Sequence, residues 1–231
     1  MDIIKQISSE LAIKYQQVEA TVKLIDEGNT IPFIARYRKE VTGSLDDEIL
    51  RNLNERLEYL RNLEDRKKTI LSSIEEQGKL TKELKKEIED ALSMVVLEDL
   101  YRPYKPKRRT RATIAKEKGL EPLANIIMLQ MTELPIEEEA SVFIDQEKGV
   151  SSEEEAISGA LDIMAENISD EANYRKYIRN ITFNEGLIVS TVKDEETESV
   201  YEMYYDYSEK IKEIPGHRIL AINRGEKEKV L

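Results

Sequence analysis

The sequence predicts an all-α, multi-helical fold with two lobes and one long helix that bridges them. Only 9 of the 231 residues are glycine, 35% are charged, and Glu, Lys, Leu and Ile predominate, a composition that favours helix over sheet. Apolar residues make up 40% of the chain, which is enough to build a core. They recur at steps of three and four between capping residues and prolines, so most of the chain is expected to form amphipathic helices.

Residues 44–77 are predicted to form the bridging helix. Ser44 is its expected N-cap, and Gly78 supplies the residue at which helices commonly end. At about 1.5 Å per residue the helix would span roughly 45–50 Å, longer than one compact lobe requires. The heptad spacing breaks at Glu64 and Lys67, so packing within the chain is favoured over a coiled-coil dimer. The apolar stripe comprises Ile49, Leu50, Leu53, Leu57, Leu60, Leu63, Ile70, Leu71 and Ile74.

Residues 1–44 are expected to form a helical start that resembles a helix-turn-helix. Two short helices are predicted between Asp2 and Glu27, with a break near residues 12–15. A DNA-reading unit and a packing hairpin give the same spacing, and the acidic residues of the second helix favour the hairpin. The segment from Ile31 is expected to dock against the long helix. Its three cations can either contact phosphate or pair with nearby carboxylates, and the sequence leaves both interpretations open for Arg36, Arg38 and Lys39.

Residues 45–120 are expected to hold the long helix, short helices and a basic arm, and residues 121–231 a second helical lobe. Caps and prolines predict helices after Thr81, Pro122, Pro135 and Ser151–Ser152, and apolar periodicity predicts helices over 95–101, 112–118 and 170–182.

Three features of the second lobe are less regular. Residues 187–192 have β-branched character without an evident partner, so a short strand or an irregular piece is expected. His217 is expected to be a capping or buried polar group, because no carboxylate–histidine–serine order can be assembled around it. Four clustered tyrosines are expected to form the packing face of a helix near the long helix. A stacking platform is the alternative, and it is disfavoured because acidic residues surround Tyr201, Tyr204, Tyr205 and Tyr207.

The charge is distributed unevenly. The chain carries a net charge of −12, yet residues 101–120 contain one acidic and eight basic residues. Pro103 and Pro106 disfavour a regular helix, so residues 101–111 are predicted to form an extended, exposed arm. Its cations suit phosphate and its tyrosines suit base stacking. The candidate nucleic-acid-binding residues are therefore Tyr101, Arg102, Tyr104, Lys105, Lys107, Arg108, Arg109 and Arg111. The alternative is that these cations hold neighbouring acidic helices together.

Catalytic and metal-binding chemistry has little support in the sequence. The absence of cysteine excludes disulfides, thiolate zinc sites and a cysteine nucleophile, and one histidine leaves little room for histidine-based sites. The acidic clusters Glu137–Glu139 and Glu153–Glu155 are interpreted as solvated helix starts. No apolar run is long enough to span a membrane and no secretion signal is evident. We therefore expect a cytoplasmic, non-enzymatic protein without membrane contact, cofactor or metal.

Five motifs resemble one known family: IPFIARYRKEVTGSLDD at 31–47, RLEYL at 56–60, GKLT at 78–81, YRPYKPKRRTRA at 101–112 and HRILAINRGEKE at 217–228. Together they resemble the N-terminal region of the bacterial Tex family of transcription accessory proteins. The resemblance implies a helical region, with a helix-turn-helix-like start, of a multidomain nucleic-acid-binding protein related to a eukaryotic elongation factor. Family members continue into RNase H-like, helix-hairpin-helix and OB-type RNA-binding domains, so we expect the chain to be part of a longer protein.

Two functional hypotheses follow. In the first, the chain is a non-catalytic scaffold that positions downstream RNA-binding domains, with auxiliary phosphate contacts from the basic arm. Its partner is then nucleic acid, RNA or DNA, bound mainly through those further domains. In the second, the chain is a purely structural or protein–protein interaction module, and the arm packs internally or on a partner such as the transcription machinery.

Overall fold

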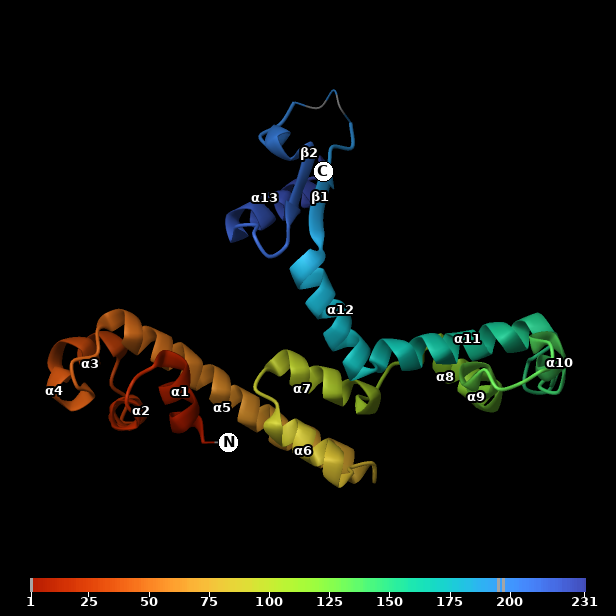
Figure 1. Ribbon diagram of the computed structural model, residues 1–231, viewed down its shortest axis with the longest axis horizontal. Coiled ribbons are helices and arrows are strands. Elements are labelled where there is room, and N and C mark those ends of the chain that lie inside the picture. Colours follow the sequence, from red (N-terminus) through yellow and green to blue (C-terminus); the bar gives the residue numbers. More distant parts are fainter. Residues whose placement is uncertain (1, 195, 197) are drawn as a thin grey trace. The chain divides into compact units, whose positions relative to one another are not determined.

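The computed structural model describes residues 2–194, 196 and 198–231, and these residues are mostly helical. The all-α prediction is therefore confirmed apart from one pair of short strands. The chain divides into two compact units, Met1–Pro106 and Lys107–Leu231 (Figure 1). The three-part division at residues 44/45 and 120/121 stays a prediction. In the described part of the chain, no helix is long and apolar enough to cross a membrane.

The first unit is built around one long helix, α5. Its N-terminal part packs against α1, α2 and α3, and its C-terminal part packs against α6 and α7 (Figure 1). The sequence predicted that this helix bridges two lobes, the second being residues 121–231. The whole of α5 instead lies within the first unit, where it joins two groups of helices. The elements are α1 (Ile3–Leu11), α2 (Tyr15–Asp26), α3 (Ile31–Tyr37), α4 (Lys39–Thr42), α5 (Asp47–Glu76), α6 (Lys82–Asp90), α7 (Met94–Tyr101) and the short 3-10 helix η1 (Arg102–Tyr104).

The predicted long helix is confirmed, but it starts later than expected. Its N-cap is Asp46, whose carboxylate accepts a hydrogen bond of 2.8 Å from the Ile49 backbone N–H. Ser44, the predicted cap, instead adopts a left-handed conformation with φ 63° in the turn after α4. An N-cap needs an extended backbone, which Asp46 has and Ser44 lacks. The helix ends before Gly78, which has φ 68° as a helix terminator should.

The apolar stripe of α5 forms the core of the first unit. Leu50, Leu53, Leu57, Leu60, Leu63, Ile70 and Ile74 are all at most 2% exposed. Lys67 interrupts this stripe and is also buried, and its ammonium donates to the Glu89 carbonyl at 2.7 Å and pairs with Glu64 at 2.8 Å. A lysine is tolerated there because its charge is compensated inside the protein.

The start of the chain forms the two predicted helices, α1 and α2. They are separated at Ala12, which ends α1 in a left-handed conformation with φ 53°. The predicted docking of the next segment is also confirmed, because α3 packs on α5 through the fully buried Ile34. The helix-turn-helix interpretation stays a prediction.

The second unit contains a helical layer and a small strand pair. The helical core is lined largely by small residues, which allow α8 and α9 to approach α11 closely. Its elements are α8 (Arg111–Glu117), α9 (Glu121–Leu129), α10 (Ile136–Ser141), α11 (Glu153–Asp170), α12 (Ala172–Glu185), β1 (Leu187–Thr191), the 3-10 helix η2 (Glu202–Tyr204), β2 (Asp206–Lys210) and α13 (Gly216–Lys227).

The strand at 187–192 has a partner that the sequence did not reveal. β1 pairs antiparallel with β2, and Leu187 lies opposite Lys210 while Thr191 lies opposite Asp206. β2 has the sequence DYSEK, in which three of five residues are charged, so its strand character comes from the pairing rather than from its own propensity.

The tyrosine cluster and His217 also differ from expectation. The tyrosines do not share one helix, and they belong to the second unit, whereas the long helix belongs to the first. Tyr204 lies in η2 and Tyr207 in β2, with their rings 5.3 Å apart in an edge-on arrangement. Tyr201 and Tyr204 are buried, so packing is their role, but in turns and a strand. His217 is neither buried nor a cap, because it is exposed in the first turn of α13.

Candidate nucleic-acid interface

The first half of the predicted arm is less extended than expected. Tyr101 ends α7 and is only 7% exposed, its hydroxyl lies 3.1 Å from Ser73 Oγ, and the Arg66 guanidinium stands 5.4 Å from its ring centre. Tyr101 is thus a core residue of the first unit rather than an exposed stacking ring. The sequence predicted a helix over 95–101, but not that Tyr101, the last residue of this helix, belongs to the apolar face that packs into the core.

Residues 102–104 form the 3-10 helix η1 directly after α7. Pro103 is accommodated because the first turn of a helix does not need its missing N–H group. Tyr104 is half-buried against the core, and its carbonyl accepts a hydrogen bond of 3.0 Å from the Gln77 amide. Arg102 and Lys105 are exposed, and the Lys105 ammonium lies 3.8 Å from Glu98. In this half, the cations face solvent while both tyrosine rings pack on the core.

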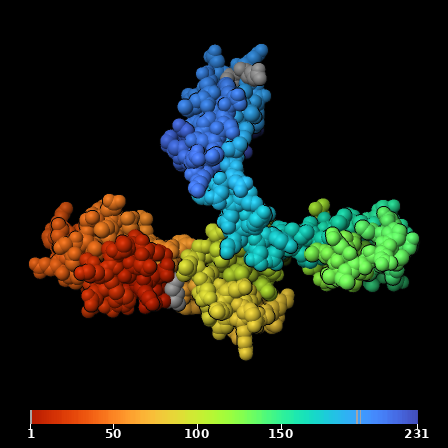
Figure 2. Space-filling view, viewed as in Figure 1, coloured from red at the N-terminus to blue at the C-terminus, as the bar shows by residue number. Residues whose placement is uncertain are grey.

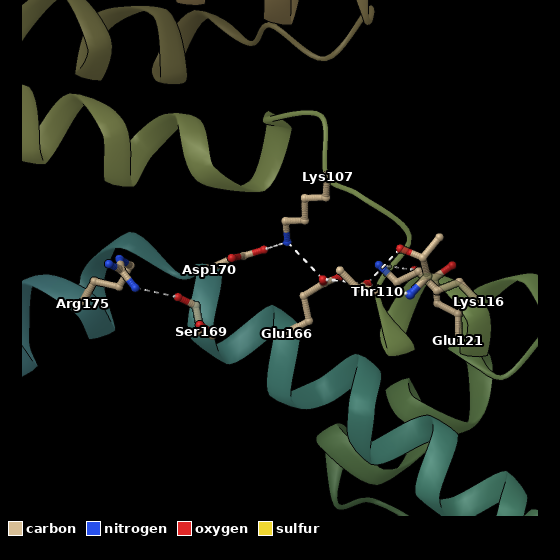
Figure 3. A network of polar contacts seen from close by, with 9 residues as sticks. Lys107, Thr110, Lys116, Glu121, Glu166, Ser169, Asp170 and Arg175 are labelled. Carbon is tan, nitrogen blue, oxygen red and sulfur yellow. Dashed lines mark hydrogen bonds and ion pairs between the residues drawn. The ribbon is translucent and has the colours of Figure 1, made fainter.

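The second half of the arm has no regular structure before α8 and is anchored to α11 (Figure 3). The Lys107 ammonium donates to the Asp170 carboxylate and lies 3.3 Å from Glu166 Oε1. The Thr110 hydroxyl donates to the same Glu166 oxygen at 3.1 Å, and its oxygen accepts a hydrogen bond of 3.0 Å from the Thr113 N–H to cap α8. Lys107 and Thr110 therefore hold the backbone on either side of Arg108 and Arg109.

The anchoring carboxylates form a ladder on one face of α11. Asp162, Glu166 and Asp170 are spaced by four residues, so they lie on the same helix face. Arg111 approaches the first of them at 3.3 Å. The side chains of Glu166 and Asp170 are only 20% and 11% exposed, so their pairing with Lys107 is screened less by water than a surface ion pair.

The sequence prediction did not include these three acidic residues. Asp162 and Glu166 are four residues apart in the helix predicted after Ser151–Ser152, but Asp170 was expected to begin the next helix, over 170–182, whereas it is the last residue of α11. Spacing alone could not say which of the many acidic side chains would face the arm. That choice depends on how α8 and α11 pack.

Arg108 and Arg109 form no ion pair with the ladder in the part of the chain that the structure describes. Arg109 pairs with Glu117 at 2.7 Å, with both side chains more than half exposed. Such a surface pair contributes little to stability and can exchange for another anion. Arg108 is exposed and makes no ion pair with any residue that the structure describes. Arg108 and Arg109 are thus the cations of the second half that an anionic ligand could approach most readily.

The acidic clusters lie where the sequence placed them. Glu137–Glu139 and Glu153–Glu155 occupy the first turns of α10 and α11, where negative charge favours the helix dipole. Within the described residues, no three His, Cys, Asp or Glu side chains gather as a metal site requires. The expectation of a chain without metal, cofactor or catalysis stays a prediction.

Two segments of the chain match models of one protein family. Residues 1–75 match the Tex-like protein N-terminal domain, and residues 132–231 match the Tex central region-like model.

Similar curated proteins are found in bacteria and in humans. The chain is 48% identical over 230 residues to an uncharacterized protein, YdcI, of Bacillus subtilis, covering 98% of this chain and 32% of that protein. It is 45% identical over 233 residues to the transcriptional accessory protein Tex of Neisseria gonorrhoeae, covering 100% of this chain and 30% of that protein. It is 30% identical over 239 residues to the human S1 RNA-binding domain-containing protein 1, covering 100% of this chain and 24% of that protein. The chain thus spans about a third or less of the length of these relatives.

Proposed function

Because this chain belongs to the Tex-like family, we propose that it is a non-catalytic helical scaffold of a nucleic-acid-binding transcription accessory protein, and that its basic arm contacts phosphate groups. The names of two relatives support this proposal, since one is a transcriptional accessory protein and another contains an S1 RNA-binding domain. In this proposal the helical units position RNA-binding parts of a longer polypeptide. Contact with the transcription machinery and a cytoplasmic location belong to the same proposal.

One observation carries the proposed phosphate contact. Arg108 and Arg109 lie between two anchor residues, Lys107 and Thr110, which both bind Glu166. The anchors hold the backbone while the two guanidinium groups remain exposed. A segment that is already ordered loses less conformational entropy when it binds, so its cations bind an anion more strongly than those of a free tail. Arginine also matches phosphate with two parallel hydrogen bonds.

The proposal is tested with the double variant Arg108→Ala/Arg109→Ala. Binding of the purified chain to fluorescein-labelled single-stranded oligonucleotides is followed by anisotropy over a range of salt concentrations. We expect weaker binding to all sequences and a salt dependence that is shallower by about 0.7 in log–log slope for each phosphate that is no longer neutralised. A matched double variant, Lys212→Ala/Lys227→Ala, removes the same charge from exposed positions of the same unit. Equal effects of the two variants would contradict the proposed role of the arm.

The second hypothesis, a purely structural module, is supported by the Lys107 anchor. The pairing of Lys107 with Glu166 and Asp170 is the internal use of arm cations that this hypothesis predicts. It requires that Lys107→Ala lowers the melting temperature and that Arg108→Ala/Arg109→Ala leaves nucleic-acid binding unchanged. The scaffold proposal requires a loss of binding from the second variant with an unchanged melting temperature. The two hypotheses are therefore separated by the same pair of measurements.

A further inference from the structure

A second group of exposed cations and aromatic rings lies in the first unit, where α3 meets α4. We call Phe33, Arg36, Tyr37, Arg38 and Lys39 the α3–α4 corner. Helix α3 buries one face against α5 through Ile31, Ile34 and Ala35. Phe33, Arg36 and Tyr37 are spaced by three and four residues, so they share the opposite face and point to solvent. The α3–α4 corner lies at the surface of the first unit, in the orange region of Figure 2.

The cations of the α3–α4 corner have no carboxylate partner in the part of the chain that the structure describes. Arg36, Arg38 and Lys39 are all exposed, and none of them forms an ion pair with a described residue. The contacts of Arg38 are with its neighbour's carbonyl, at 3.3 Å from Tyr37 O, and with the Phe33 ring, at 5.2 Å from its centre. The chain has 47 acidic and 35 basic residues, so carboxylates are plentiful. Three neighbouring cations that pair with none of the described ones point to an external anion.

The aromatic rings of the α3–α4 corner are exposed as well. Tyr37 is 61% exposed, and its ring centre lies 5.3 Å from that of Phe33. Large aromatic side chains are usually buried, because burial of their apolar surface is favourable. An exposed tyrosine among cations offers a flat surface on which a base can stack while the cations meet the flanking phosphates.

The position of the α3–α4 corner is fixed by contacts behind it. The Gln17 amide of α2 donates to the carbonyls of Thr42 at 3.2 Å and Gly43 at 3.1 Å. Thr42 is fully buried, and Gly43 adopts φ 65°, which glycine accepts without strain. A Cβ at Gly43 would lie 2.7 Å from the Gln17 side-chain nitrogen, so a larger residue would displace the amide that holds these two carbonyls. The rings and cations therefore lie on two short helices and the residue between them, with α3 packed on α5 and the end of α4 held by α2.

We propose that the α3–α4 corner is a binding surface for single-stranded nucleic acid. Arg36, Arg38 and Lys39 contact the phosphates, and a base stacks on Tyr37 beside the Phe33–Arg38 pair. A single strand is the ligand that fits, because its bases are free to stack whereas those of a duplex are not. This surface belongs to the first unit and depends neither on the basic arm nor on its anchors.

The proposal is tested on the 231-residue chain with a labelled 15-nucleotide oligo-dT, its RNA equivalent and a duplex of the same length. The triple variant Arg36→Ala/Arg38→Ala/Lys39→Ala is expected to bind the single strands about tenfold or more weakly, with a log–log salt slope shallower by about 2. The matched control, Lys79→Ala/Lys82→Ala/Lys86→Ala, removes the same charge from exposed positions of the same unit. The proposal fails if both triple variants weaken binding equally, or if the duplex binds as tightly as the single strands.

The stacking contact is tested separately with Tyr37→Ala. We expect about fivefold or greater loss of oligo-dT affinity at an unchanged salt slope, because a ring and not a charge is removed. Poly-L-glutamate serves as an anion without bases, and its binding should be insensitive to Tyr37→Ala. An unchanged oligo-dT affinity would show that no base stacks on Tyr37 and would overturn the proposed stacking contact. Tighter binding of poly-L-glutamate than of oligo-dT would show that the surface binds acidic protein segments instead. Because all substituted side chains are exposed, the melting temperature should stay within about 2 °C of the unaltered chain. The Arg108→Ala/Arg109→Ala variant, measured in parallel, separates failure of the arm from failure of the α3–α4 corner.

Discussion

Lys107 and Thr110 bind the same carboxylate oxygen of Glu166, at 3.3 Å and 3.1 Å. This shared acceptor converts a basic, proline-containing segment into one with two attachment points on α11. Two arginines lie between these points and face solvent. Glu166 is therefore expected to control how ordered the arm is, although it carries no positive charge and would not itself bind nucleic acid.

Replacing Glu166 by alanine should release the arm. We expect the variant to lose about 1–2 kcal/mol of unfolding free energy, because a partly buried lysine and a hydroxyl both lose a partner. Trypsin should also cleave after residues 107–109 about fivefold or more faster, since local opening becomes easier. The control is Glu133→Ala, which removes an exposed carboxylate of the same unit. Equal cleavage rates in the two variants would mean that Glu166 does not hold the arm.

The core position of Leu57 gives a prediction for the first unit. Leu57 is 2% exposed at the centre of the α5 stripe. Leu57→Ala removes buried methyl groups and leaves a cavity, so we expect a loss of about 2–5 kcal/mol in a urea titration. Leu92→Ala, at a position that is 50% exposed, should cost below roughly 1 kcal/mol. A cost of less than about half a kcal/mol for Leu57→Ala would be incompatible with the packing of α5.

The pH dependence of the first unit should reflect the Glu10–Arg56 pair. Arg56 donates hydrogen bonds of 2.5 Å and 2.7 Å to Glu10, and these bonds lower the pKa of Glu10 below its ordinary value of 4.5. A carboxylate with a lowered folded-state pKa stabilises the fold above its unfolded-state pKa, and this stabilisation is lost as the pH falls through the folded-state pKa. Glu10→Gln should therefore cost about 0.5–1 kcal/mol near pH 7, and the cost should shrink once the pH falls below about 4.5.

The measurement for this prediction is urea unfolding at several pH values. Glu27→Gln provides the control, because Glu27 is exposed and forms no ion pair with a described residue. A cost of Glu10→Gln that stays constant down to about pH 3 would contradict an ionic contribution from this pair.

The second unit depends on close packing at Gly159. A Cβ at this position would collide with the Leu120 side chain and lie 3.3 Å from the Ala115 Cβ. Gly159→Val is expected to destabilise the unit by about 1–3 kcal/mol, because the buried Leu120 cannot move away freely. Ser158→Val, at the neighbouring exposed position of α11, provides the matched control and should change stability by less than about 1 kcal/mol. Similar thermal shifts for both variants would argue against the tight contact of α11 with Ala115 of α8 and with Leu120, which precedes α9.

Local patterns were sufficient to predict most helices. The α5 stripe, the Thr81 cap and the break near Ala12 are confirmed because each depends on residues within a few positions of one another. The predictions were wrong where the local sequence fits two alternatives equally well. Ser44 and Asp46 are both capping residues, and only the turn after α4, which gives Ser44 a positive φ, excludes the first. β2 lacked a strand pattern because its conformation comes from pairing with β1.

The fold class, the family and the location of the basic window can all be read from the amino-acid sequence. These properties depend on composition, periodicity and contiguous motifs. The use of each cation follows from the folded structure, because it depends on which carboxylates the packing of helices brings near. Lys107 meets Glu166 and Asp170 because α11 lies beside the second half of the arm, whereas Arg36, Arg38 and Lys39 are exposed and form no ion pair with a described residue. Both groups have similar local sequences, and it is the three-dimensional arrangement of their neighbours that distinguishes them.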